Sequence, residues 1–139
     1  MLSSLVIIPL FFLVFLVFGT MLSGLISLLG GWYRFEKKYP LLDLINQISV
    51  FDYSSIQFNT IGSYNNCIRI TLYKEGVGLE PLLVFRAFHK PVFIAWNQID
   101  VMYEKKEFFY PTLDVYVDGN KIRFYGKAMK AIMESYQKK

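Results

Sequence analysis

The first 33 residues of the chain contain no charged side chain, and charged residues follow at once. A helix that crosses a bilayer needs about 20 apolar residues, and the stretch from Leu5 to Leu29 supplies this length. A signal peptide would carry a basic segment before a much shorter apolar core. We therefore expect residues 1–33 to form an uncleaved transmembrane anchor, which makes the protein an integral, single-pass membrane protein.

Basic residues flank only the C-terminal end of this apolar run, where Arg34, Lys37 and Lys38 follow it. Because basic residues are enriched on the cytoplasmic side of membrane proteins, these three are expected to determine the topology. They predict an N-terminus outside and a cytoplasmic C-terminal domain. Three neighbouring aromatic residues stand where an interfacial belt would lie: Trp32, Tyr33 and Phe35.

Small residues recur at four-residue spacing in the anchor, as Gly19, Ser23 and Ser27. In lipid, such a stripe allows a second helix to approach closely. We interpret it as a candidate helix-pairing surface, for another copy of the chain or for a larger membrane partner. The alternative is that glycine and serine are simply common in membrane spans.

All 15 basic and all 11 acidic residues lie after residue 33, so the net charge of +4 belongs to the remaining part. A unit of about 105 residues can bury its own core without disulfides, and the single cysteine, Cys67, excludes an internal one. Abundant tyrosine, phenylalanine, isoleucine and valine favour β-structure. A moderate basic excess without a base-stacking platform does not indicate nucleic-acid binding.

Residues 34–50 are expected to form a juxtamembrane segment that contains a short helix. Pro40 is suited to a first helical turn, and helical spacing relates the apolar residues that follow it: Leu41, Leu44, Ile45 and Ile48. This pattern predicts a helix close to the membrane.

Residues 51–139 are expected to form the β domain, since from Ile56 onward apolar and polar residues alternate. Residues 62–66 interrupt this alternation, and a strand is expected to follow them. A turn at residues 75–76 would pair Leu72 with Leu79 and place Tyr73 over Gly78, an aromatic cover for a strand glycine.

A second hairpin is predicted around the Asp118–Gly119 turn, a dipeptide typical of two-residue hairpin loops. The expected register pairs Val115 with Ile122 and Leu113 with Phe124 on the inner face. It also places Asp114 opposite Arg123 on the outer face, where opposite charges lie directly across the strands.

The rest of the domain alternates between short strands and turns and then ends in a helix. Strands are predicted at residues 92–96 and 99–103, and a solvated turn at residues 104–107. A final helix from about Lys127 has one apolar face, formed by Met129, Ile132, Met133 and Tyr136.

The predicted fold is mainly β (α+β): a curved antiparallel sheet or small barrel, closed by a C-terminal amphipathic helix. Residues 74–79, residues 93–99, the Asp118–Gly119 hairpin and the closing helix resemble the pleckstrin-homology-like (PH-like) superfamily, in particular bacterial PH-like and GRAM-like domains. The resemblance implies a PH-like domain in a small protein of the bacterial inner (plasma) membrane.

The sequence contains no nucleotide-binding glycine motif and no nucleophile elbow. Its single histidine, His89, cannot fill a histidine-based metal site or a convincing catalytic triad. We therefore expect no catalytic residue, no cofactor and no metal.

One segment combines basic and aromatic residues between two predicted strands: Phe85, Arg86, Phe88, His89 and Lys90. It is a candidate contact for a partner or for lipid, with aromatic rings at the interface and cations at anionic headgroups. The alternative is that Phe85 and Phe88 belong to the core while the cations merely reach solvent.

Three functions remain open from the sequence. The leading hypothesis is a non-catalytic, membrane-anchored module that binds a protein partner or helps assemble a membrane complex, through a sheet edge, the 85–91 loop or the transmembrane helix. The alternatives are an anionic lipid-headgroup binding domain and a membrane-anchored immunity or inhibitor protein.

Overall fold

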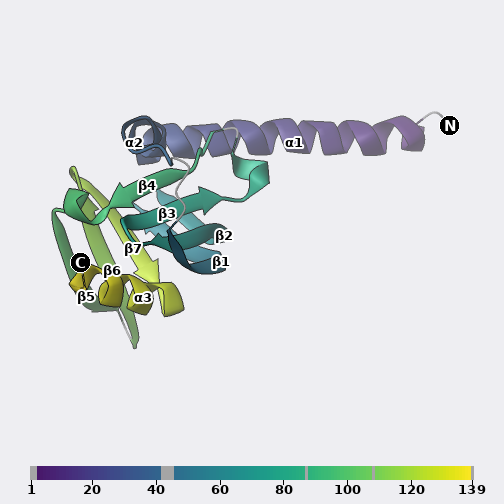
Figure 1. The fold of residues 1–139 in the computed structure, drawn as a ribbon. Coiled ribbons are helices and arrows are strands. Elements are labelled where there is room, and N and C mark those ends of the chain that lie inside the picture. Colours follow the sequence, from purple (N-terminus) through teal and green to yellow (C-terminus); the bar gives the residue numbers. More distant parts are fainter. Residues whose placement is uncertain (1–2, 42–45, 87, 108, 139) are drawn as a thin grey trace.

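The computed structural model describes residues 3–41, 46–86, 88–107 and 109–138. The helices and strands are α1 (Ser3–Gly30), α2 (Trp32–Lys38), β1 (Gln47–Phe58), β2 (Gly62–Tyr73), β3 (Gly76–Pro81), η1 (Leu83–Phe85), β4 (Val92–Ala95), η2 (Trp96–Gln98), β5 (Val101–Glu107), β6 (Tyr110–Val117), β7 (Asn120–Tyr125) and α3 (Gly126–Gln137). In Figure 1, α1 runs along the top of the molecule and the β domain lies beneath its C-terminal part.

The seven strands form one curled antiparallel sheet in the order β4-β3-β2-β1-β7-β6-β5. The sheet bends at β1. The pairing of β1 with β2 shifts register between Phe51 and Ser54, and Tyr53 in this stretch has a φ of 55°. Such bulges bend a strand and increase its twist. Strand β1 pairs along much of its length with β2 and, at Ile56–Phe58, also with β7 through its other edge.

The C-terminal helix α3 lies on the sheet through the apolar face expected from the sequence. Met129 and Ile132 are buried, and the ring of Tyr136 meets that of Trp96 at 6.2 Å between centroids. Seven antiparallel strands followed by a closing helix make a PH-like fold, which confirms the predicted fold class.

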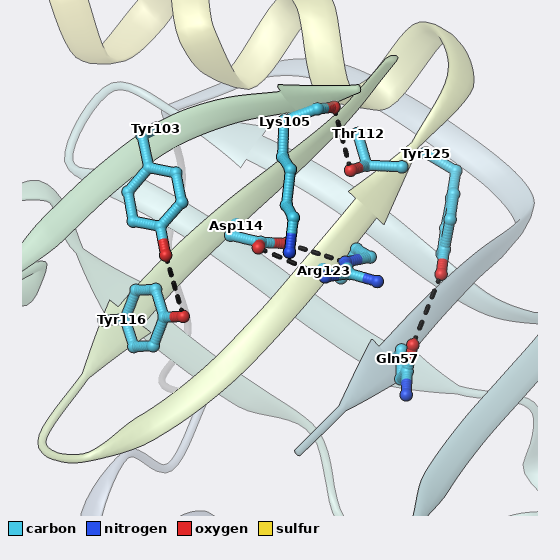
Figure 2. A network of polar contacts seen from close by, with 8 residues as sticks. All are labelled: Gln57, Tyr103, Lys105, Thr112, Asp114, Tyr116, Arg123 and Tyr125. Atoms are coloured by element: carbon cyan, nitrogen blue, oxygen red, sulfur yellow. Dashed lines mark hydrogen bonds and ion pairs between the residues drawn. The ribbon is translucent and has the colours of Figure 1, made fainter. Parts of the chain in front are cut away.

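The β6–β7 hairpin has the predicted register, with Val115 opposite Ile122 and Asp114 opposite Arg123. The charged pair lies directly across the strands as predicted, but it is buried, because the side chains of Asp114 and Arg123 are only 1% and 7% exposed. Figure 2 shows the side chain of Lys105 extending toward the ion pair. Tyr103 and Tyr116 lie to one side of Asp114 in this view. The two ions are thus buried although they lie on the face of the hairpin opposite to Val115 and Ile122.

The β2–β3 hairpin differs from the predicted register by two residues, since Leu72 pairs with Val77 rather than with Leu79. The turn lies one residue earlier than expected because Gly76 belongs to β3. A Cβ atom on Gly76 would come within 2.1 Å of the Ile94 carbonyl oxygen in β4, so this glycine serves close strand packing. The predicted aromatic cover is nevertheless present, since Tyr73 lies against Gly78.

Three further sequence predictions require correction. Residues 62–66 are the start of β2, and Glu104 belongs to the edge strand β5 rather than to a turn. The helix predicted at residues 40–48 falls partly outside the described residues, at 42–45, and its end is strand, because Gln47 and Ile48 open β1.

Helix α1 is the one described helix that is long and apolar enough to cross a membrane. Its residues from Ser3 to Leu22 are exposed around the whole helix, over a length of about 30 Å. Partial burial begins at Ser23, and the face that includes Ser27 and Gly30 is buried against the domain.

Candidate functional site

The segment of residues 82–91 between β3 and β4, called here the β3–β4 loop, lies against the C-terminal part of α1 (Figure 1). It contains η1 and all five residues predicted as a partner or lipid contact. The structure therefore brings two predicted sites together, because this loop meets the small-residue stripe of α1.

Two serines of the stripe bind this loop of the same chain. The Ser27 hydroxyl donates to the Phe88 carbonyl at 2.5 Å, and the Ser23 hydroxyl lies 3.3 Å from Nδ1 of His89. The stripe side of the helix that we expected to face a second helix is thus occupied here by the domain. Only Gly19 has open space beside its Cα, and helix pairing there stays a prediction.

His89 is buried, with 1% of its surface exposed, and connects α1 to the sheet. Its Nε2 lies 2.7 Å from the hydroxyl of Tyr64 in β2, while Nδ1 meets Ser23. Burial lowers the pKa of His89 below its ordinary value, although a hydrogen bond with the Phe85 backbone acts in the opposite direction. A neutral ring offers one donor and one acceptor, which two hydroxyl groups can satisfy.

Side chains of helix α2 bind the backbone of the same loop. The indole N–H of Trp32 donates to the Lys90 carbonyl at 3.1 Å, and the Glu36 carboxylate accepts from the Lys90 N–H at 3.0 Å. Burial raises the pKa of Glu36, and the Lys90 N–H and the nearby lysine charges oppose this shift. Both side chains are buried, so this junction is tightly packed.

The expected interfacial aromatic belt is therefore only partly available to lipid. Trp32 and Phe35 are core residues, 0% and 2% exposed, whereas Tyr33 is 41% exposed. The Trp32 ring packs against Phe58 and Tyr64 at 5.3 and 5.4 Å between centroids. Sequence position alone could not distinguish a belt residue from one that turns back into the domain.

A sharp turn between α1 and α2 makes this packing possible. Gly31 has a φ of 91°, a left-handed conformation that glycine adopts without steric cost at helix ends. The Asn59 side-chain amide donates to the Gly30 carbonyl at 2.8 Å and thereby caps the end of α1. The helix and the domain are thus fixed to each other at both the loop and the helix terminus.

Three of the predicted contact residues, Phe85, Arg86 and Phe88, are only partly buried, so neither sequence interpretation holds without change. Phe85 and Phe88 are 38% and 39% exposed, and they border a groove of about 270 Å³ against α1. Arg86 is directed back to β3, since its Nε donates to the Pro81 carbonyl at 3.0 Å and its guanidinium lies 3.7 Å from Glu80.

The three expected topology determinants lie on α2, at the end of the apolar helix. Lys37 lies over the Tyr33 ring, 4.1 Å from its centroid, and Lys38 forms an ion pair with Asp118 in the β6–β7 turn. Arg34 lines a cleft of about 430 Å³ between α2 and this turn.

Sequence analysis missed a second exposed feature, on the β5–β6 hairpin. Phe109 and Tyr110 are 89% and 75% exposed, and Tyr110 also lines a mainly apolar groove of about 370 Å³ beside Met129 of α3. In Figure 1 this hairpin extends away from α1. The aromatic doublet is visible in the sequence, but nothing local to it indicates an exposed hairpin.

The Ser23–His89 contact pairs a hydroxyl with an imidazole, a combination that nucleophilic catalysis uses. In such enzymes a third group orients the base, often a carboxylate. Here Tyr64 takes that position and the ring is buried. Within the described part of the chain, no group of three His, Cys, Asp or Glu residues could hold a metal ion. The geometry is that of a structural connection.

Comparisons with known proteins bear on the fold alone. No family model matches the chain, and no curated protein matches it. Among solved structures, it is similar to a chain of the 8S snRNP assembly intermediate, with a TM-score of 0.50 and 7% identity over 72% of this chain and 86% of that one. The Vps36 N-terminal PH domain gives a TM-score of 0.49 and 7% identity, over 66% of this chain and 79% of that one.

Proposed function

We propose that this protein is a non-catalytic, membrane-anchored interaction module that binds a protein partner and helps assemble a membrane complex. In this proposal α1 crosses the bacterial inner membrane, with its N-terminus outside and the PH-like domain in the cytoplasm. The observation that carries the proposal is the junction at His89, because it joins an exposed apolar helix rigidly to a PH-like domain.

A rigid junction has a functional consequence for an anchored domain. A flexible linker would let the domain sample many orientations, whereas fixed contacts to Ser23, Ser27 and Trp32 hold one face toward the bilayer. The opposite face, with Phe109 and Tyr110, is then presented to the cytoplasm. Exposed aromatic residues are enriched in protein–protein contacts, which supports a protein partner at this hairpin.

The state of the two sheet edges also favours the β5–β6 hairpin as the contact for a protein partner. The edge at β4 is covered, since Phe93 donates its N–H to the Tyr39 carbonyl and Leu41 donates to the Pro91 carbonyl. Among the described residues no further strand pairs with the other edge, β5, but this strand carries charged residues, which discourage pairing with a foreign strand. Contact through side chains at the hairpin tip therefore fits better than addition of a strand.

In vivo photo-crosslinking of the full-length, C-terminally tagged protein tests this function. A photoreactive residue at Phe109 is expected to capture one discrete protein in native membranes, and Tyr110→Ser is expected to reduce the yield. The same probe at Ile61, which is 52% exposed on the β1–β2 turn beside α1, is the matched control. Recovery of the protein alone from both positions would contradict the proposal.

The cleft at Arg34 favours a second candidate function, recognition of an anionic lipid headgroup. It lies at the end of the apolar helix, where headgroups would be, and it is lined by Arg34 and Lys38. Each basic residue near an anionic surface contributes about 1 kcal/mol. Full-length protein purified in mild detergent should then retain anionic phospholipid, Arg34→Gln should lose it, and Lys37→Gln should keep it. Equal lipid content in both variants would exclude this site.

A further inference from the structure

The β3–β4 loop exposes a cluster of large apolar side chains beside the membrane anchor. Leu83 is 77% exposed, and Leu82, Phe85 and Phe88 are between 36% and 39% exposed. Contiguous apolar patches of this kind usually mark a contact with a protein or a membrane. These four residues are called here the loop patch.

The loop patch has a defined level along α1. The groove between the loop and the helix is lined by Phe85 and Phe88 on one side and by helix residues from Phe15 to Ser23 on the other. The ring of Phe88 also lies against Gly24, where an added Cβ would come within 3.2 Å of it. The loop therefore runs beside the second half of the apolar helix and not beyond its end.

The rest of the helix surface at this level is apolar and exposed. Phe18, Leu22 and Leu25 are 66%, 47% and 50% exposed, and Leu28 further along is 52% exposed. These side chains require hydrocarbon if α1 spans a membrane. A bilayer that covers them on one side of the helix also reaches Phe85 and Phe88 of the loop patch on the other, because these two residues lie at the same level of α1.

The hydrogen bonds of the loop backbone are also compatible with a position in the bilayer. Backbone in lipid is stable only when its polar groups are satisfied within the protein. Here the N–H groups of Phe85, Arg86 and Phe88 donate to carbonyls within the loop. The Ser27 hydroxyl donates to the Phe88 carbonyl, and the Arg86 guanidinium, which shares a cleft with Leu82 and Leu83, lies 3.7 Å from Glu80.

We propose that the loop patch enters the cytoplasmic leaflet beside α1, with acyl chains filling the groove, so that the domain is partly immersed in the bilayer. This inference rests on the proposed membrane span of α1. The anchor then has two parts, a helix and a loop, which together fix the tilt and the rotation of the domain against the membrane.

Depth-dependent fluorescence quenching tests the immersion. The full-length protein with Cys67→Ala carries one new cysteine at Leu83, Val14 or Phe109, labelled with an environment-sensitive fluorophore and reconstituted in phosphatidylcholine vesicles that contain dibrominated lipids. Leu83 and Phe109 are 77% and 89% exposed, which limits the effect of the label on folding.

The expected result is strong quenching at Val14, comparable loss of fluorescence at Leu83, and none at Phe109. Quenching at Val14 with an unquenched, water-like spectrum at Leu83 would overturn the immersion while leaving the membrane span intact. Absence of quenching at Val14 would instead overturn the span, and the immersion with it. Quenching at all three positions would also contradict the inference, because it would mean that the domain lies on the membrane without a fixed orientation.

Discussion

The Nε2 atom of His89 lies 2.7 Å from the hydroxyl oxygen of Tyr64, and this contact joins the β3–β4 loop to the second strand of the sheet. On its other side the imidazole meets Ser23 of α1. One buried ring thereby connects the apolar helix, the loop and the sheet. The interpretation of the protein as a rigidly oriented membrane module depends on this junction.

Tyr64→Phe tests the energetic contribution of the junction. The change removes one hydroxyl and leaves a buried ring nitrogen of His89 without its hydrogen-bond partner, which costs about 1–3 kcal/mol. We expect a lower midpoint in thermal unfolding of the full-length protein in detergent micelles. Tyr53→Phe, at a position that is 69% exposed, should leave the midpoint unchanged. Equal midpoints for both variants would show that the contact is energetically neutral.

Protonation of His89 is expected to weaken the fold. Its pKa is lowered by burial, so the unfolded chain takes up a proton near the ordinary value of 6.5 while the folded chain does not. The stability that the neutral ring contributes is therefore present above pH 6.5 and is lost as the pH falls through the lowered pKa. Glu36 has a raised pKa and acts in the opposite direction, with stability lost as the pH rises through that pKa.

The single histidine makes this pH prediction directly measurable, because the imidazole resonances in an NMR titration belong to His89. We expect a midpoint below 6.5 in the folded protein. In Glu36→Gln the titration should remain shifted in the same direction, since burial is its main cause. A midpoint at or above 6.5 would mean that the ring is solvated or carries a charge partner.

Two glycines of α1 provide a matched pair of substitutions. Gly24→Leu should displace the Phe88 ring, which lies within 3.3 Å of the position of an added Cβ, and so weaken the contact between helix and loop. At Gly19 an added Cβ would meet no heavy atom within 4 Å, and the rest of a leucine side chain has the groove beside Phe85 and Phe88 to occupy. Overpacking of this kind costs about 1–3 kcal/mol. Thermal unfolding in micelles should show a loss for Gly24→Leu alone, and equal losses would contradict this account of the stripe.

The buried pair of Asp114 and Arg123 predicts a larger effect. Asp114→Ala removes a carboxylate oxygen that accepts from the Arg123 Nε at 2.8 Å and leaves a guanidinium that is 7% exposed without it. Breaking one side of a buried ion pair typically costs about 3–5 kcal/mol. Chemical denaturation should detect this loss, and Asp114→Leu combined with Arg123→Met should recover part of it. An effect below about 1 kcal/mol would show that the pair behaves like a surface ion pair.

Local sequence signals predicted those parts of the fold that local forces determine. The β6–β7 register follows from the Asp118–Gly119 turn and from the alternation of apolar residues on either side of it. Both signals relate residues that are close in the sequence. The face of α3 follows from helical spacing in the same way. Where β4 approaches Gly76, by contrast, a distant strand decides the position of the turn, and the predicted register was wrong.

The candidate site could be predicted only in pieces. The sequence indicated both the β3–β4 loop and the small-residue stripe, but Ser23 and His89 are 66 residues apart and nothing local relates them. The burial of Trp32 was missed for the same reason, because it depends on the left-handed turn at Gly31 and on a domain formed by later residues.

Cysteine accessibility in intact cells tests most directly whether α1 crosses the membrane and holds the domain in the cytoplasm. In the Cys67→Ala background, a cysteine at Ser3 and one at Lys138 are treated separately with a membrane-impermeant maleimide. We predict labelling of the Ser3 position from outside, and labelling of the Lys138 position only after the membrane is permeabilised. Labelling of Lys138 in intact cells, or release of the protein from membranes by alkaline washing, would contradict the proposed anchor and its orientation.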